Sequence, residues 1–210
     1  MTILPQLEKN KGTISSKLGR ALAQDVLAGQ AEILAEAVDL LSHESKQVRA
    51  GAAKIVEQVA LSDPMLVVGY LPRLLPALDV DEPQTRWMAL HTLGLCAALD
   101  TSTALQALPK AETFIDADSG ACLWGSTIIY LGYLGATSEA NARVALPLLV
   151  RALAIPGREK DVLRSFVRLM DVADDQMRSR MGQLAAPYVD SESGVLSKVA
   201  RQVLKRAGVA

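Results

Sequence analysis

The sequence is poor in aromatic residues and in cysteine. It has two Trp, four Tyr and two Phe among 210 residues, although half of the chain is apolar. A core with so few rings must be aliphatic, and the abundant Ala and Leu favour close-packed helices over sheets. Cys96 and Cys122 are too few for a disulfide framework, so we expect a reducing, cytoplasmic setting.

A strong charge of one sign is also absent. Lys and Arg number 22 and Asp and Glu 23, giving a net charge of −1, so we do not expect the whole chain to attract nucleic acid. The charges are unevenly placed. Residues 51–150 have five basic and ten acidic side chains, whereas residues 151–210 have eleven and seven, so the middle of the chain is acidic and its C-terminal part is basic.

The sequence gives no sign of a secretory leader or a membrane anchor. Its first 13 residues lack the basic-then-apolar order of a signal peptide. One run, residues 119–138, is uncharged over 20 residues, which is long enough to span a bilayer. Four of these residues are Gly and five are Ser or Thr, so we expect a buried central helix instead.

A small residue followed four places later by a large aliphatic one recurs along the chain. Residues i and i+4 lie on the same face of a helix, so each pair is suited to packing against a neighbouring helix. Successive small residues are 37, 36, 40 and 35 places apart, and a period of this size is typical of a solenoid. The pairs are Ala52 and Val56, Ala89 and Leu93, Gly125 and Ile129, Ser165 and Leu169, and Ala200 and Leu204.

A second series, of Leu-Pro pairs, lies between these segments at spacings of 37 and 38 residues. Proline removes a backbone hydrogen bond, so it predicts a bend in each of these first helices. Two series with one period but different phases indicate two helices per repeat. The prolines concerned are Pro72 with Pro76, Pro109, Pro147, and Pro187, which matches Pro76.

These periods predict a single helical-repeat domain over residues 1–210. The segment from Ser16 to Ala28 is expected to be an N-terminal capping helix. The last helix is polar at Lys198, Gln202 and Lys205, as a terminal repeat with no further neighbour must be. The predicted ranges are 1–30 for the cap and 31–62, 63–100, 101–137, 138–174 and 175–208 for five repeats.

The second helices of the first two repeats begin alike, with VRAGAAKIV at 48–56 and TRWMALHTLG at 85–94. Together with the Leu-Pro first helices and the polar turns, these segments resemble HEAT repeats of the armadillo-like superfamily, over about residues 31–208. The resemblance implies an all-α fold, a right-handed α-solenoid of about five helix pairs. It also implies that the second helices line the concave surface and the first helices the convex one.

The middle repeats depart from the pattern in their second helices. Trp87 and His91 are one helical turn apart, at positions where the first repeat has Ala50 and Lys54. When the repeats are aligned by their small residues, Leu123 and Trp124 of the next repeat fall beside Trp87 and His91. The resulting patch, predicted for the middle of the concave face, consists of Trp87, Met88, His91, Leu123 and Trp124.

Arg164 and Arg168, one turn apart in the fourth repeat, are predicted to border this patch. Tryptophan and arginine often carry binding energy, about 2 kcal/mol or more each at a well-packed contact. One interpretation is therefore a groove that grips a peptide or helix by an apolar anchor and one or more carboxylates. The other is that the two tryptophans fill space between repeats whose remaining residues are small.

No catalytic or metal-binding motif stands out, and we expect no cofactor and no metal. The histidine nearest to His91 in sequence lies in a different turn, so a catalytic or ligand pair is not expected. Asp116 and Asp118 imitate the start of a calcium loop. Gly120 comes one place too early, however, and the twelfth position is Thr127 in place of Glu.

Three functions remain open. The first is a non-enzymatic interaction module or scaffold that binds a protein or peptide partner on its concave face, with no nucleic-acid or membrane partner. The second is a HEAT-like enzyme, of the alkylpurine DNA glycosylase or chromophore lyase type. The acidic second and third repeats argue against an enzyme that binds DNA. The third is a subunit of a larger assembly or a homo-oligomer. The glycosylase resemblance implies DNA contacts by Trp87, Trp124, Arg164 and Arg168, and a carboxylate at Asp171.

Overall fold

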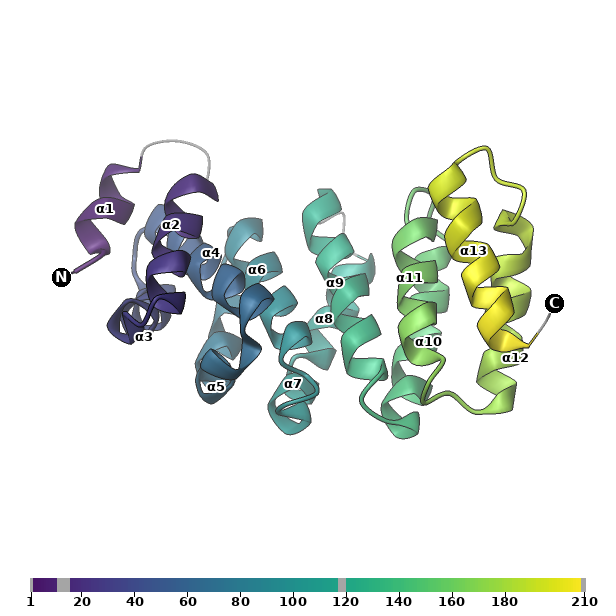
Figure 1. Cartoon of the computed structure of the whole chain (residues 1–210). Coiled ribbons are helices and arrows are strands. Elements are labelled where there is room, and N and C mark those ends of the chain that lie inside the picture. Colours follow the sequence, from purple (N-terminus) through teal and green to yellow (C-terminus); the bar gives the residue numbers. More distant parts are fainter. Residues whose placement is uncertain (1, 11–15, 117–119, 209–210) are drawn as a thin grey trace.

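The chain folds into helices that follow one another in file from the N-terminus to the C-terminus (Figure 1). The computed structural model describes residues 2–10, 16–116 and 120–208. Over these ranges it consists of helices and turns, with no β-strand. The molecule is therefore the all-α solenoid that the sequence predicts.

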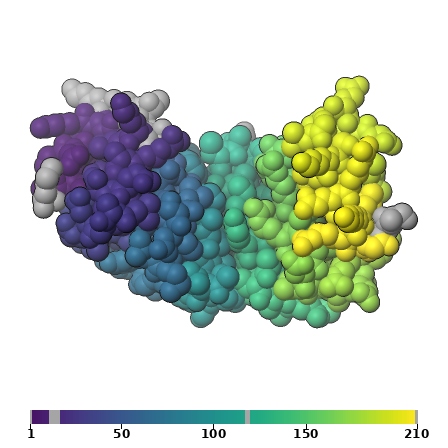
Figure 2. All heavy atoms as spheres, viewed as in Figure 1, coloured from purple at the N-terminus to yellow at the C-terminus, as the bar shows by residue number. Residues whose placement is uncertain are grey.

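The N-terminal helix α2 and the second helices of the repeats form one layer. Each helix in this layer packs against the one before it and the one after it, so the layer runs the length of the molecule. Its members are α2 (Ser16–Leu27), α4 (Lys46–Ser62), α6 (Pro83–Leu95), α9 (Gly120–Gly135), α11 (Glu159–Leu169) and α13 (Gly194–Ala207). In the space-filling view, the upper edge of the molecule lies lower over the teal middle than over the purple and yellow ends (Figure 2).

The first helices form the other layer, and proline interrupts two of them. Between residues 64 and 78 the chain forms three 3-10 turns around the four-residue helix α5, where Pro72 and Pro76 lack the N–H donors of a regular helix. In the third repeat the helix breaks just before Pro109, whereas Pro147 lies inside a continuous α10. The layer comprises α3 (Ala31–Asp39), α5 (Leu71–Leu74), α7 (Thr101–Gln106), α8 (Leu108–Asp116), α10 (Glu139–Leu153) and α12 (Asp175–Ala185).

A short helix that the sequence does not predict, α1 (Leu4–Lys9), joins α2 in covering α4 at the N-terminal end of the stack. Leu7 is buried against Gly51, whose Cβ position would lie 2.8 Å from a Leu7 methyl carbon. The Gln47 side chain donates hydrogen bonds to carbonyl oxygens at the end of α1, including that of Asn10 at 2.6 Å. The first repeat is therefore closed by two helices instead of one.

The predicted packing pairs are buried in the first, second and fourth repeats, at Ala52 with Val56, Ala89 with Leu93, and Ser165 with Leu169. The uncharged run of residues forms α9, which lies between α6 and α11. None of the helices described is both long enough and apolar enough to cross a membrane.

The pair predicted for the third repeat, Gly125 and Ile129, is wrong. Both residues are only half-buried, and no heavy atom lies within 4 Å of the Cβ position of Gly125. The buried pair is one place later, at Ser126 and Tyr130. The Tyr130 Cα atom lies 2.9 Å from the Cβ position of Gly94 in α6, so this glycine is what lets α6 and α9 approach so closely.

Candidate functional site

The second-helix layer leaves one stripe of each helix uncovered between its two neighbours. The residues of a stripe recur every three or four places, as one face of a helix requires. We call the surface formed by the stripes of α6, α9 and α11 the open face. Its members are Gln84, Trp87, His91 and Leu95 on α6; Cys122, Gly125, Ile129 and Tyr133 on α9; and Lys160, Arg164 and Arg168 on α11, with Asp171 in the turn that follows it.

Trp87 and His91 lie together on the open face, where both are half-buried, and side chains of α4 hold them in place. The Lys54 Nζ atom lies 5.3 Å from the centre of the Trp87 ring, a cation–π contact. The same nitrogen is 2.7 Å from one carboxylate oxygen of Glu57, and the other oxygen is 2.9 Å from His91 Nδ1. Glu57 is only 2% exposed, so the network is anchored beneath the surface.

The environment of Glu57 favours its charged form. Burial raises the pKa of this carboxyl, but the hydrogen bonds and charges of His91 and Lys54 outweigh burial and bring the pKa below its usual value. An ionised carboxylate only accepts hydrogen bonds, so His91 Nδ1 carries a hydrogen and donates it to Glu57. The orientation of the imidazole ring is thereby fixed.

Two residues of the predicted patch do not belong to it. Met88 and Leu123 are fully buried among the packed helices and cannot contact a partner. Met88 is adjacent to Trp87, about 100° further round α6, and so points into the core. The error at Leu123 follows from aligning the third repeat on Gly125, one place before its buried pair.

Trp124 is the residue equivalent to Trp87, 37 places later, yet it lies off the open stripe of α9. It is half-buried, and the guanidinium carbon of Arg158 stands 4.9 Å from its ring centre. Arg158 is itself buried and donates a hydrogen bond of 2.9 Å to the carbonyl of Ile115 at the end of α8. Trp124 therefore packs beneath the turn before α11, and the two tryptophans do not form one contiguous patch.

Arg164 and Arg168 lie on the open face, on the opposite side of α9 from Trp87. The guanidinium carbon of Arg168 is 4.6 Å from the centre of the Tyr133 ring, so the two side chains are stacked. Arg164 is exposed, with an ion-pair distance of 3.5 Å to Asp161. The open face thus has an aromatic side on α6 and a cationic side on α11.

Between these two sides, α9 presents Gly125 and Ile129. The absence of any heavy atom within 4 Å of the Gly125 Cβ position means that the space above this glycine is open. Ile129, one turn further along, adds an aliphatic surface. The middle of the open face is therefore apolar and has room for a side chain that the protein does not supply.

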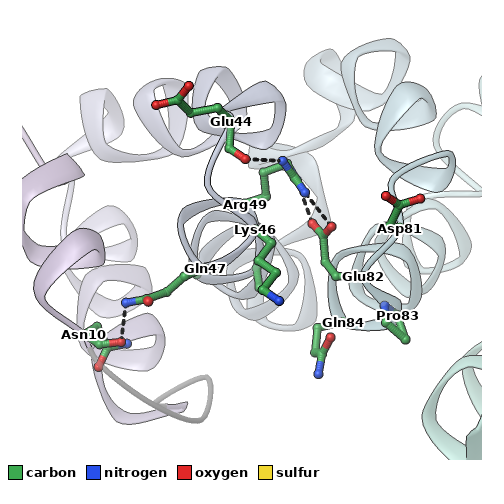
Figure 3. Close-up of a pocket in the computed structure, with 11 residues that line it drawn as sticks. Asn10, Glu44, Lys46, Gln47, Arg49, Asp81, Glu82, Pro83 and Gln84 are labelled. Atoms are coloured by element: carbon green, nitrogen blue, oxygen red, sulfur yellow. Dashed lines mark hydrogen bonds and ion pairs between the residues drawn. The ribbon is translucent and has the colours of Figure 1, made fainter.

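The structure also has a pocket that the sequence does not predict, with a volume of about 700 Å³. It lies between α1 and the N-terminal ends of α4 and α6, where Gln47 reaches Asn10 on one side and Arg49 pairs with Glu82 on the other (Figure 3). Small residues, among them Ala50, line it at the position where the second repeat has Trp87. Sequence reasoning misses the pocket because it also misses α1, which closes one side.

Chemical groups that would suggest catalysis are dispersed. Within the described ranges no three His, Cys, Asp or Glu side chains are placed to hold a metal ion, and Asp118 lies outside those ranges. Asp171 forms an ion pair with Arg206 at 3.1 Å. Cys122 is exposed at the start of α9, whereas burial raises the pKa of the Cys96 thiol to about 12.

Known proteins resemble this chain in structure. No protein-family model and no curated protein matches its sequence. A computationally designed armadillo repeat protein for modular peptide recognition superimposes with a TM-score of 0.70 and 15% identity, over 90% of each chain. An engineered protein superimposes with a TM-score of 0.73 and 16% identity, over the whole of both chains. A designed armadillo repeat protein in complex with the peptide (KR)4 superimposes with a TM-score of 0.72 and 14% identity, over 98% of both chains.

Proposed function

From the premise that this chain has an armadillo-like helical-repeat fold, we propose that it is a non-enzymatic module that binds a protein or peptide segment across the open face. The observation that carries the proposal is the pair Trp87 and His91, held on an uncovered surface by the buried Glu57. The resemblance to HEAT repeats implies that this surface is the concave one.

The network around Glu57 suits binding better than stability. A buried ion pair contributes little net stability, because removing charges from water costs about as much as their attraction returns. Here the network fixes the rings of Trp87 and His91 before any partner arrives. Side chains that are already ordered lose little entropy on binding, so such a surface binds more tightly than a mobile one.

The open space above Gly125 is the second support for the proposal. Gly125 adds no side chain to the exposed stripe of α9, which lies between the helix of Trp87 and the helix of the two arginines. A side chain placed there would have Ile129 beside it on α9, Trp87 on the α6 side, and Arg164 and Arg168 on the α11 side. Large aromatic and arginine side chains at the centre of a contact are those that most often carry binding energy.

The similar structures support the same use of the fold. One relative is a protein designed for modular peptide recognition, and another is in complex with a peptide. Identities of 14–16% establish the shared fold and no more. For this chain, the binding of a peptide therefore depends on the open face described above.

The test is to select peptides from a displayed random library on the wild-type protein and measure their affinity for two variants. Gly125→Phe fills the open space without a clash. Gly69→Phe is the matched control, because Gly69 also has no heavy atom within 4 Å of its Cβ position but lies in the first-helix layer. Circular dichroism verifies that both variants fold.

We expect the selected peptides to bind Gly69→Phe as they bind the wild type, and Gly125→Phe on the order of tenfold more weakly. Equal affinity for the two variants would show that the peptides bind elsewhere. Failure to select any peptide on the wild-type protein would also contradict the proposal.

A further inference from the structure

We infer that the segment bound on the open face is acidic and carries one bulky apolar side chain, which enters the space above Gly125. This inference rests on the proposed function and adds the chemistry of the partner. It is carried by the excess of cations on α11 and by the open space above Gly125 on the neighbouring helix.

The carboxylates at the open face are already engaged by cations of the chain itself. Glu57 pairs with Lys54 and His91, as described above. Asp161 lies 3.5 Å from Arg164 and 3.8 Å from Lys160, and Asp171 pairs with Arg206. A basic partner would find no free carboxylate on α6, α9 or α11 within the open face.

The arginines of α11 are less fully paired than these carboxylates. Arg168 is stacked on Tyr133, and within the described part of the chain its guanidinium forms no ion pair; its one hydrogen bond is a 3.4 Å contact to the carbonyl of Arg164. Stacking occupies the flat face of a guanidinium and leaves its N–H edge free to bind a carboxylate with two parallel hydrogen bonds. Arg164 is exposed beside it and shares the single carboxylate of Asp161 with Lys160, so these two cations outnumber their acidic partner.

The apolar part of the partner follows from the neighbouring helix. Gly125 has open space above it, Ile129 offers an aliphatic surface, and Trp87 stands on the α6 side. A leucine or a larger apolar side chain placed there would be removed from water, at roughly 25 cal/mol per Å² of apolar surface buried. A smaller side chain would bury less apolar surface there.

The distance between α9 and α11 sets how many residues of the bound segment separate its apolar side chain from its carboxylates. Packed helices lie about 10 Å apart, and an extended chain advances about 3.3 Å per residue. A segment that crosses the helices therefore places its carboxylates over α11 about three residues from the apolar side chain over α9. Either order along the segment, apolar before acidic or the reverse, satisfies this spacing.

The expected charge preference distinguishes this chain from one of its structural relatives. That designed armadillo repeat protein is in complex with the basic peptide (KR)4. A peptide of this composition on the open face would bring its cations against Arg164 and Arg168, and like charges brought together oppose binding. We therefore expect the opposite charge preference from a similar fold.

The experiment uses three fluorescein-labelled octapeptides and fluorescence anisotropy. The first has leucine at its second residue and acidic residues at its fifth to seventh, with glycine or serine elsewhere. The second has alanine in place of the leucine, and the third is (KR)4. We expect the first to bind, the second to bind about fivefold more weakly, and (KR)4 not to bind. Raising the salt concentration weakens the first complex, as screening requires.

Charge reversal on the protein completes the test. Arg164→Glu combined with Arg168→Glu is expected to weaken the acidic peptide on the order of tenfold or more, while Arg180→Glu leaves it unchanged. Arg180 is the matched control because it is exposed on α12, in the first-helix layer. Circular dichroism and thermal unfolding verify that both variants are folded.

The outcomes separate the inference from the proposed function. If the acidic peptide binds the double variant as well as it binds the wild type, or if (KR)4 binds better, the acidic inference is overturned. Should library-selected peptides of neutral or basic composition lose affinity for Gly125→Phe, the proposed function stands and the inference alone fails. Should no peptide be sensitive to Gly125→Phe, both fail.

Discussion

Glu57 of α4 and His91 of α6 are 34 residues apart in the sequence, and a carboxylate oxygen of one lies 2.9 Å from a ring nitrogen of the other. This contact joins the first repeat to the second. It also lies directly beneath the uncovered surface that contains Trp87. The same few side chains therefore contribute to the packing between repeats and to the shape of the open face.

Replacement of Glu57 by alanine is expected to lower the free energy of unfolding by about 2–4 kcal/mol, because in a largely buried site Lys54 loses its ion-pair partner and His91 loses its hydrogen-bond acceptor. Urea unfolding followed by circular dichroism measures the change. Glu44→Ala is the control: Glu44 is exposed, and we expect a change within about 0.5 kcal/mol. Equal effects of the two substitutions would show that the network is not buried as described.

The same carboxyl makes stability depend on pH in the acid range. Folding lowers the pKa of Glu57 from its ordinary 4.5, so the folded state binds fewer protons than the unfolded state. The stabilisation is present above that value and is lost as the pH falls through the lowered pKa. We expect the free energy of unfolding of the wild type to fall more steeply than that of Glu57→Gln between about pH 5 and pH 3. Parallel curves in urea titrations at each pH would contradict this.

Two helical glycines are expected to respond oppositely to a larger side chain. At Gly94 a Cβ atom would lie 2.9 Å from the Tyr130 Cα atom, so Gly94→Val must push α6 and α9 apart, at a cost of about 1–3 kcal/mol. At Gly125 nothing is near, so Gly125→Ala should be neutral or stabilise the helix by up to about 1 kcal/mol. Thermal unfolding of the two variants tests the prediction, and a destabilised Gly125→Ala would show that this glycine is packed.

The two cysteines should differ sharply in reactivity. Cys122 is exposed, whereas Cys96 is buried and its pKa is raised to about 12, which leaves almost no reactive thiolate at neutral pH. Ellman's reagent should therefore modify one thiol per native chain, and the second only after unfolding. In native Cys122→Ser, Ellman's reagent should modify no thiol. Modification of two thiols in the native wild type would contradict the burial of Cys96.

The fold could be predicted from the sequence because each repeat buries small and aliphatic residues at regular intervals. Ala52 with Val56 and Ala89 with Leu93 mark buried helix faces without any knowledge of their neighbours. The third repeat shows where this reasoning fails. The spacing predicts Gly125 as a packing residue, yet a glycine at open space and one in a close contact, such as Gly94, look identical in a sequence.

The candidate site could be predicted only in part, because exposure depends on the exact phase of each helix. A shift of one residue turns a side chain by about 100°, enough to move it from the surface into the core. Such a shift accounts for the wrong prediction of Leu123 as a surface residue. Trp124 is half-buried because Arg158, 34 residues later in the sequence, packs over its ring. Contacts of this kind depend on how repeats stack, which a single sequence does not record.

The central claim is that a partner binds beside Trp87 and over Gly125, and the emission of Trp87 tests it most directly. In a Trp124→Phe background Trp87 is the remaining tryptophan. Titration with the acidic leucine octapeptide should change its emission with the same midpoint as the anisotropy, and the added substitution Gly125→Phe should raise that midpoint on the order of tenfold. Emission that stays constant while the peptide binds would place the partner elsewhere on the molecule.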